Sequence, residues 1–331
     1  ILREKLIFAE PLRIIKVAFG RPFLFACGPG PVSPCLNIRE DVMRKSLISA
    51  GVISMVIGAA QAETAEINGS TLSYTVVGDG PAVMVMHGGL GLDHTYLRPC
   101  FDQLSDGYSV IYYDHHGNGQ SDHPADFSDL TMDRLVSDAD GLRAHLGHND
   151  MILVGHSYGG FIAQAYAAAH QDKLTGLALI DTAPALDYEP ALAGNDAQMG
   201  ALGALFAGPM PDDETFRATW NLVIQMYFKD YDPALGAKLD EATTYSYQAW
   251  NAAAGLLGSF NMVEELPKVS VPVYAVAGRV DGITPPEQGA GRIADLAPNA
   301  QLKIFENSGH YPFIEEEKVF FDDLRSWMSG L

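Results

Sequence analysis

Residues 151–160 read MILVGHSYGG, and the fold class can be inferred from them. An apolar run suited to a buried strand leads into Gly155-x-Ser157-x-Gly159, and a helix-like run of small residues follows. This pattern between a strand and a helix is typical of the nucleophile elbow, a strained turn that lifts the serine hydroxyl clear of a sheet. Side chains in place of the two glycines would clash with the neighbouring strand and helix. We therefore predict that Ser157 is a catalytic nucleophile.

Apolar runs rich in β-branched residues recur on both sides of this turn. They are TLSYTVV (71–77), AVMVM (82–86), YSVIYY (108–113), MILV (151–154), GLALI (176–180), VPVYAVA (271–277) and QLKIF (301–305). Amphipathic stretches typical of helices lie between them, among them 133–146, 161–170, 286–296 and 315–328. Such alternation predicts an α/β fold with a mostly parallel central sheet and helices on both faces.

The alternation stops once, between about residues 184 and 267, where aromatic residues are frequent and strand signals are almost absent. A helical insertion after a sheet strand usually covers the carboxyl edge of the sheet, where open α/β sheets bind ligands. We predict a helical cap over this segment. The alternative is that its aromatic side chains pack only the core of the insertion itself.

A catalytic serine needs a base, and the base needs an acid that orients it. In this architecture the chain order is serine, acid, histidine, each at the carboxyl end of a strand. Asp281 follows the strand-like run at 271–277, and His310 follows the run at 301–305. Either residue alone would be equally well explained as part of an ordinary loop. Both together, behind an elbow, predict a triad of Ser157, His310 and Asp281.

Acyl transfer also needs hydrogen-bond donors for the developing oxyanion. Directly after the run at 82–86 the chain reads HGGLG, and glycines there let the backbone approach a substrate closely. We predict that the amides of Gly89 and Tyr158 form the oxyanion hole. His87 and His156 are interpreted as structural.

From about residue 70 to 329 the chain resembles the α/β-hydrolase superfamily, and within it the proline iminopeptidase-like and esterase group. The motifs that carry the resemblance are HGGLG (87–91), YDHHGNGQS (113–121), GHSYGG (155–160), GRVDGITPP (278–286) and NSGHYPF (307–313). The resemblance implies the same triad and oxyanion donors. It implies no metal and no cofactor.

Departures from that group bear on the substrate. Iminopeptidases of this kind hold the free amino terminus of the substrate with acidic residues of the cap, or with one just after the triad aspartate. Here Gly282 and Ser259 occupy the matching positions, and Leu90 replaces a proline. Glu241 or Glu264 could substitute, but neither lies in a matching motif. We therefore expect a carboxylesterase for small to medium esters, with a proline iminopeptidase-like aminopeptidase or amidase as the alternative.

Two further hypotheses come from other classes: a non-catalytic binding protein on the same fold, and a metallohydrolase. The second rests on YYDHHGNGQSDH (112–123), which is rich in histidine and aspartate. Adjacent side chains of an extended chain point in opposite directions, and the stretch has no H-x-x-x-H spacing. We predict a glycine turn that binds no metal. Whether His115 or His116 contacts the substrate is left open.

The amino-terminal part has a different character. Residues 43–62 combine a basic start, an apolar core and an Ala-Gln-Ala end, as in a secretory signal, whereas a buried helix is the alternative. We predict a leader outside the fold at residues 1–42, a signal peptide at 43–62, a hydrolase domain at 63–331, and a secreted or periplasmic enzyme.

The charge of the predicted domain limits its partners. Removing the eight Lys/Arg and four Asp/Glu of residues 1–62 from totals of 21 and 41 leaves 13 and 37, a formal charge of −24. So negative a chain disfavours nucleic acid and anionic membrane surfaces. We expect a small-molecule ester or amide as the partner, and no stable membrane association after signal cleavage.

Overall fold

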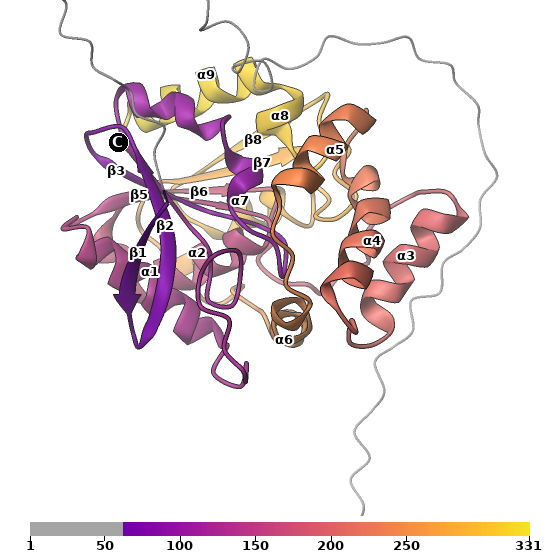
Figure 1. The fold of residues 1–331 in the computed structure, drawn as a ribbon. Helices are drawn as coiled ribbons and strands as arrows, with labels where there is room; N and C mark the ends of the chain where they lie inside the picture. The colour runs from indigo at the N-terminus through magenta and orange to yellow at the C-terminus, as the bar shows by residue number, and fades with distance from the viewer. Residues whose placement is uncertain (1–61) are drawn as a thin grey trace, which may run out of the picture. The chain divides into compact units, whose positions relative to one another are not determined.

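The computed structural model describes residues 62–331. Their core is one eight-stranded sheet with the strand order β1-β2-β4-β3-β5-β6-β7-β8 (Figure 1). The strands are β1 (Glu63–Ile67), β2 (Ser70–Val77), β3 (Ala82–Met86), β4 (Ser109–Tyr113), β5 (Met151–His156), β6 (Leu174–Ile180), β7 (Val273–Gly278) and β8 (Ala300–Phe305). β1 pairs antiparallel with β2, and β2 pairs antiparallel with β4. All other neighbouring strands of the sheet are parallel. The predicted, mostly parallel sheet is confirmed.

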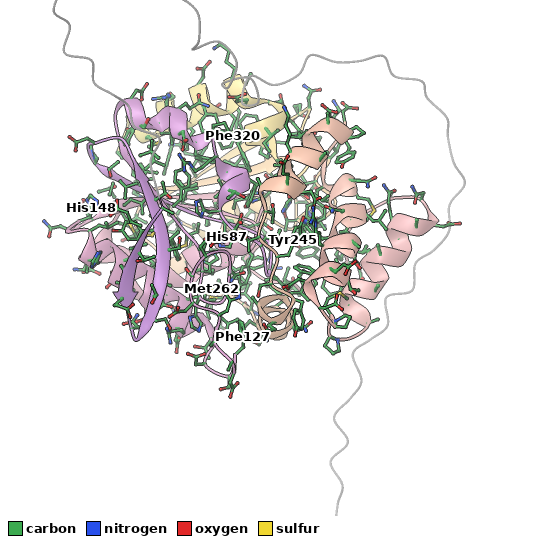
Figure 2. The ribbon with its side chains drawn as sticks, in the orientation of Figure 1. His87, Phe127, His148, Tyr245, Met262 and Phe320 are labelled. Carbon is green, nitrogen blue, oxygen red and sulfur yellow. The ribbon has the colours of Figure 1, made fainter. Side chains whose placement is uncertain are left out.

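Helices account for the continuous apolar character of the central strands. Every residue of β3, β4 and β5 is buried, as expected where both faces of a parallel sheet are covered. The covering helices include α1 (Met132–His145), α2 (Tyr158–His170), α7 (Ala290–Leu296), α8 (Pro312–Glu315) and α9 (Glu317–Met328). Figure 2 shows Phe320 of α9 above the strands, and its ring lies 5.4 Å from that of Phe305 in β8.

The register brings the carboxyl ends of the strands to one edge. Met86 of β3 lies opposite Gly155 of β5, and Gly278 of β7 lies opposite Phe305 of β8. The loops that leave β3, β5, β7 and β8 therefore start close together. These are the loops on which the sequence places the predicted site residues.

Four helices occupy the interval between β6 and β7. They are α3 (Asp196–Ala207), α4 (Asp213–Val223), α5 (Pro233–Ala242) and α6 (Tyr247–Leu257), and they form a group of their own in Figure 1. Before each helix stands a capping residue whose side chain accepts a hydrogen bond from a backbone amide of the first turn. The capping residues are, in order, Asn195, Asp212, Asp232 and Ser246. Contacts join this segment to the loops at the strand ends; for example, the Ser246 amide donates to the Gly91 carbonyl.

One strand escaped the sequence prediction. In β1, the residues ETAEI alternate only partly, because Glu63, Thr64 and Glu66 are exposed. The signal that could have found it is Asn68-Gly69 between β1 and β2, where both residues have positive φ (50° and 81°). Asn-Gly is the favoured pair for such a tight hairpin turn.

Among residues 62–331 no helix is both long enough and apolar enough to cross a membrane. The leader and signal predictions lie outside the described residues, apart from Ala62.

Candidate active site

Ser157 lies at the sharp turn between β5 and α2. Its φ of 53° and ψ of −118° are strained for a residue with a side chain, as expected of an elbow. A Cβ on Gly159 would lie 2.3 Å from the carbonyl oxygen of Met86, and one on Gly155 would lie 2.5 Å from the carbonyl of Gly159. Both positions therefore require glycine, for the reason that the sequence pattern suggests.

The structure brings Asp281 and His310 together. Asp281 is three residues beyond β7, and its Oδ2 lies 2.8 Å from Nδ1 of His310, five residues beyond β8. The Thr284 hydroxyl also donates to Oδ2, and the Ile283 amide donates to Oδ1. Burial opposes ionisation of Asp281, but the imidazole and the donated hydrogen bonds outweigh it and lower the pKa of this carboxyl. Asp281 is therefore an ionised partner for the histidine.

His310 is fixed from both sides. Its backbone amide donates to the carbonyl of Tyr227, at the end of the short 3-10 helix η5 (Ile224–Tyr227) that follows α4, at 2.6 Å. A Cβ on Gly278 would lie 1.9 Å from the Gly309 carbonyl, so glycine is needed for the end of β7 to approach this loop. Nε2 is buried and has no hydrogen-bond partner among the residues that the structure describes. This nitrogen is the atom that a serine nucleophile would use as its base.

The predicted oxyanion donors flank Ser157. A Cβ on Gly88 would lie 2.7 Å from Cβ of Ser157, so the loop after β3 passes directly beside the serine. Gly89 follows with a φ of 71°. Tyr158 is the first residue of α2, where a backbone amide has no acceptor within the helix and the helix dipole favours negative charge. These two amides are suited to a developing oxyanion.

Tyr96 joins three of these loops, and sequence reasoning missed it. Its hydroxyl lies 2.6 Å from both the Gly88 amide nitrogen and Nδ1 of His156, and Nε2 of His156 lies 2.8 Å from the His310 carbonyl oxygen. Because the Gly88 amide can only donate, the phenol hydrogen goes to Nδ1, and Nε2 carries the proton that the His310 carbonyl accepts. Burial, with the neighbouring His310, holds the pKa of His156 well below its ordinary value. His156 is thus a neutral link, in agreement with its structural interpretation.

The histidine-rich loop is tied to the strand ends. The rings of His87 and His115 stack with centroids 3.9 Å apart, and Nε2 of His115 lies 3.0 Å from the His87 carbonyl oxygen. Nε2 of His116 lies 3.5 Å from Asp129. Figure 2 shows His87 near the centre of the molecule. Within residues 62–331, the only group of three or more side chains placed to hold a metal ion contains none of these histidines.

That group consists of Asp181, Asp281 and His310, whose ligand atoms all lie within 4.8 Å of one another. Asp181 follows β6 with a φ of 44°, and its Oδ1 accepts the Gly278 amide at 2.8 Å. Burial first, and then the charge of Asp281, raise the pKa of Asp181 well above its ordinary value. Sequence reasoning did not find Asp181, because an aspartate after a strand carries no motif of its own.

Acidic side chains of the α3–α6 segment are exposed or already bound. Glu241 and Glu264, the two proposed substitutes for an amine-binding acid, are exposed. Asp240 accepts a bidentate pair from Arg217 and a further bond from Asn221, which lower the pKa of its carboxyl. A cavity of about 20 Å³, room for about one water, lies beside it and reaches Tyr311.

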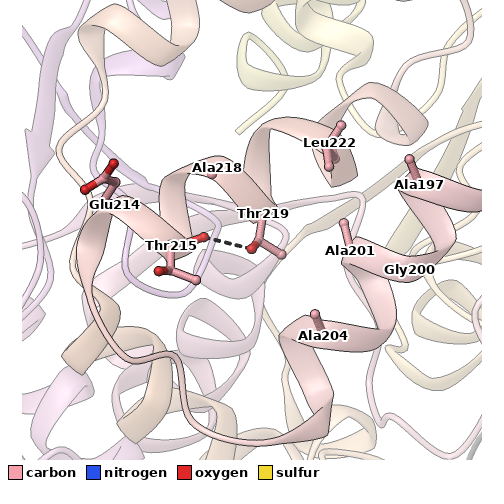
Figure 3. A pocket seen from close by; sticks show the side chains of 9 residues that line it. All are labelled: Ala197, Gly200, Ala201, Ala204, Glu214, Thr215, Ala218, Thr219 and Leu222. Atoms are coloured by element: carbon pink, nitrogen blue, oxygen red, sulfur yellow. Dashed lines mark hydrogen bonds between the residues drawn. The ribbon is translucent and has the colours of Figure 1, made fainter.

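A larger open groove of about 510 Å³ lies between α3 and α4 (Figure 3). It is lined by Ala197, Gly200, Ala201, Ala204, Glu214, Thr215, Ala218, Thr219 and Leu222. The lining has one ionisable side chain and no nucleophile with a base. The groove is large enough to hold a substrate, but its lining side chains offer no catalytic group.

Comparisons with known proteins identify the fold and the family. A family profile described as alpha/beta hydrolase fold matches residues 81–317. The chain is similar to a proline iminopeptidase of Pestalotiopsis fici, with 28% identity over 80% of this chain and 98% of the relative. It is also similar to a proline iminopeptidase of Saccharolobus solfataricus, with 27% identity over 77% of this chain and 87% of the relative.

Solved structures give the same fold. An alpha/beta fold family hydrolase from Bacillus anthracis matches with a TM-score of 0.69 and 24% identity, over 81% of this chain and 99% of that one. A thermophilic esterase from Thermogutta terrifontis matches with a TM-score of 0.64 and 25% identity, over 82% and 99%. Since the family profile spans more than half of the sequence, the chain belongs to the α/β-hydrolase fold family.

Proposed function

We propose that this hydrolase cleaves carboxylic esters through an acyl-enzyme formed on Ser157. The observation that carries the proposal is the buried His310, with Nδ1 bonded to Asp281 and Nε2 without a partner among residues 62–331, at the same sheet edge as the elbow. A serine nucleophile needs a base of this kind, with one ring nitrogen held by an acid and the other free to take a proton.

The mechanism is acyl transfer in two steps. The Ser157 hydroxyl attacks the ester carbonyl while Nε2 of His310 takes its proton, and Asp281 stabilises the imidazolium. The amides of Gly89 and Tyr158 donate to the oxyanion of the tetrahedral intermediate. His310 then protonates the leaving alcohol, and afterwards activates the water that hydrolyses the acyl-enzyme.

The acids around the site favour an ester over a substrate with a free amino terminus. Glu241 and Glu264 are exposed, and Asp240 is bound by Arg217. At the position after the triad aspartate, a Cβ on Gly282 would lie 3.0 Å from the Ala191 carbonyl, so an acidic side chain there would have to displace backbone. An ammonium group would thus find none of these carboxylates both free and near the serine. The α3–α6 segment, in this proposal, is the cap over an uncharged substrate.

The test is hydrolysis of p-nitrophenyl butyrate by the wild type and by Ser157→Ala. We expect the variant to lose at least about 10³-fold in kcat while its circular dichroism spectrum is unchanged, and to escape labelling by a fluorophosphonate probe. Full activity in Ser157→Ala would refute the proposal. Absence of labelling in the wild type would favour a non-catalytic binding protein.

A proline iminopeptidase activity is the second candidate, because the curated relatives in Pestalotiopsis fici and Saccharolobus solfataricus carry that name. The ratio of kcat/KM for L-proline p-nitroanilide and p-nitrophenyl butyrate separates the two. We expect the ester to be preferred. A higher kcat/KM for the proline arylamide would reverse the order.

A further inference from the structure

Asp181 is a buried carboxyl group that the proposed mechanism does not use. It lies just beyond β6 and is fully buried, and its Oδ1 accepts the amide of Gly278 at 2.8 Å. Oδ2 finds no donor in the described part of the chain. Ligand atoms of Asp181, Asp281 and His310 lie within 4.8 Å of one another.

Two buried carboxylates this close cannot both carry a charge without a compensating cation. Within residues 62–331, Asp281 forms an ion pair with His310, and no ion pair includes Asp181. The titratable groups that act on Asp181 are Asp281 beyond β7, and Glu315 in α8, both of which disfavour its ionisation. Burial acts in the same direction. One proton between the two aspartates resolves the conflict, as in other carboxyl pairs that share a site.

A divalent cation in place of that proton is disfavoured by distance. A metal ion bound by both Nδ1 of His310 and Oδ2 of Asp281 would hold these atoms ~3 Å apart or more, because each metal–ligand bond is about 2 Å long. The observed 2.8 Å fits a direct hydrogen bond instead.

We propose that Asp181 is a positioning residue for the triad acid: it stays a neutral carboxylic acid, and its hydroxyl donates to the carboxylate of Asp281. The inference rests on the proposed serine mechanism. Asp181 then supplies Asp281 with a further donor, and it adds no second negative charge beside His310.

Asp181→Asn is the matched variant, because an amide reproduces a neutral acid. Its oxygen accepts from Gly278 and its NH₂ donates to Asp281, and asparagine tolerates the positive φ. With p-nitrophenyl butyrate we expect kcat/KM within about threefold of the wild type. The midpoint of the acid limb of kcat/KM should not move. If Asp181 were ionised, the variant would remove a charge near His310 and lower that midpoint by roughly a pH unit or more, which would overturn the proposal.

Asp181→Gly removes the donor without straining the backbone. We expect kcat to fall about 10- to 100-fold with KM nearly unchanged, the effect of losing one hydrogen bond to a charged group. A purely structural role would lower the melting temperature and leave the kcat of the folded protein intact, and that result would contradict the proposal.

Asp281→Asn supplies a second readout. In that variant residue 281 no longer carries a charge, so Asp181 can lose its proton and become the negative group beside His310. We expect Asp281→Asn to be at least about 10-fold more active than the double variant that also carries Asp181→Asn. Equal activities would overturn the inference.

The two proposals fail in different ways. Activity in Ser157→Ala refutes the serine mechanism whatever Asp181 does. An inactive Ser157→Ala, together with a shifted acid limb in Asp181→Asn, refutes only the neutral acid. Loss of wild-type activity in EDTA, restored by a divalent metal, would also overturn it, because a cation would then occupy the place of the proton.

Discussion

The Tyr96 hydroxyl joins Gly88, in the loop after β3, to His156 at the elbow, and His156 in turn reaches the carbonyl of His310. Because this hydroxyl already binds the Gly88 amide, that amide is withheld from the substrate and Gly89 is the next donor available. The structural chain from Tyr96 through His156 to the His310 carbonyl explains why both of these buried side chains are polar.

Tyr96→Phe should therefore leave the Gly88 amide and Nδ1 of His156 unpaired. We expect a loss of about 1–3 kcal/mol in the free energy of unfolding, measured with urea, and a fall in kcat of roughly tenfold with little change in KM. Tyr113→Phe is the control, since the buried Tyr113 hydroxyl has no partner among the described residues. Equal effects of the two substitutions would show that the Tyr96 hydrogen bonds are unimportant.

Glycine at the elbow is the second prediction for a single residue. Gly159→Ala would place a methyl group 2.3 Å from a backbone oxygen of Met86, so strand β3 or helix α2 must shift. We expect a loss of several kcal/mol in stability, or no soluble protein. Gly255→Ala, in α6 with nothing within 4 Å, should instead stabilise the protein by about 0.5–1 kcal/mol. A tolerated Gly159→Ala would show that the elbow has another geometry.

Among the elements, the short helix α8 ties the site to the α3–α6 segment. Glu315 accepts the amides of Gly309, beside His310, and of Lys229, in the loop after α4, each at 2.7 Å. Burial outweighs these hydrogen bonds and raises the pKa of Glu315 to about 7. An acid with a raised pKa binds its proton more tightly in the folded state, so stability falls as pH rises from its unfolded value through the folded one.

The third prediction follows from this fall in stability with rising pH. Between pH 5 and pH 8 the free energy of unfolding of the wild type should fall, by up to about 3 kcal/mol, relative to that of Glu315→Gln. Chemical denaturation at several pH values measures the difference. Glu264→Gln, at an exposed position, should keep the wild-type slope. A Glu315→Gln variant with an unchanged slope would contradict the assigned titration.

Strands and helices whose own residues form a clear apolar pattern were predicted well. Those whose position depends on contacts with distant parts of the chain were not. The strands at 82–86 and 151–156 are apolar throughout and could be read directly. Helix α7 begins at Ala290, four residues later than expected, because Pro285 and Pro286 belong to the loop that carries Asp281. Strand β1 contains two glutamates and is stabilised only by its hairpin partner β2.

The site shows the same division. Ser157, Asp281 and His310 each follow a readable strand, so their placement at one edge of the sheet could be predicted, and Asp281 and His310 are in contact there. Asp181 and Tyr96 act through partners 60 to 100 residues away in sequence, as in the bonds from Asp181 to Gly278 and from Tyr96 to His156. Single-sequence reasoning has no access to such pairings. The spacing of the histidines in 112–123 already indicated, from the sequence, that they do not form a chelating cluster.

For the molecule as a whole, the proposed mechanism needs no metal, although the formal charge of −20 would attract cations to its surface. Dialysis against EDTA should leave kcat/KM for p-nitrophenyl butyrate within about twofold of its starting value. Zinc added back should give no gain. A metal-dependent loss and recovery of activity would restore the metallohydrolase hypothesis.

The exposed glutamates of β1 have a consequence for handling the protein. β1 is an edge strand, so its outward row of backbone groups is a template on which another chain could add. Glu63 and Glu66 place negative charge along that edge and oppose such an addition. Replacing both glutamates with glutamine removes this repulsion, so the double variant should associate edge to edge at lower protein concentrations than the wild type.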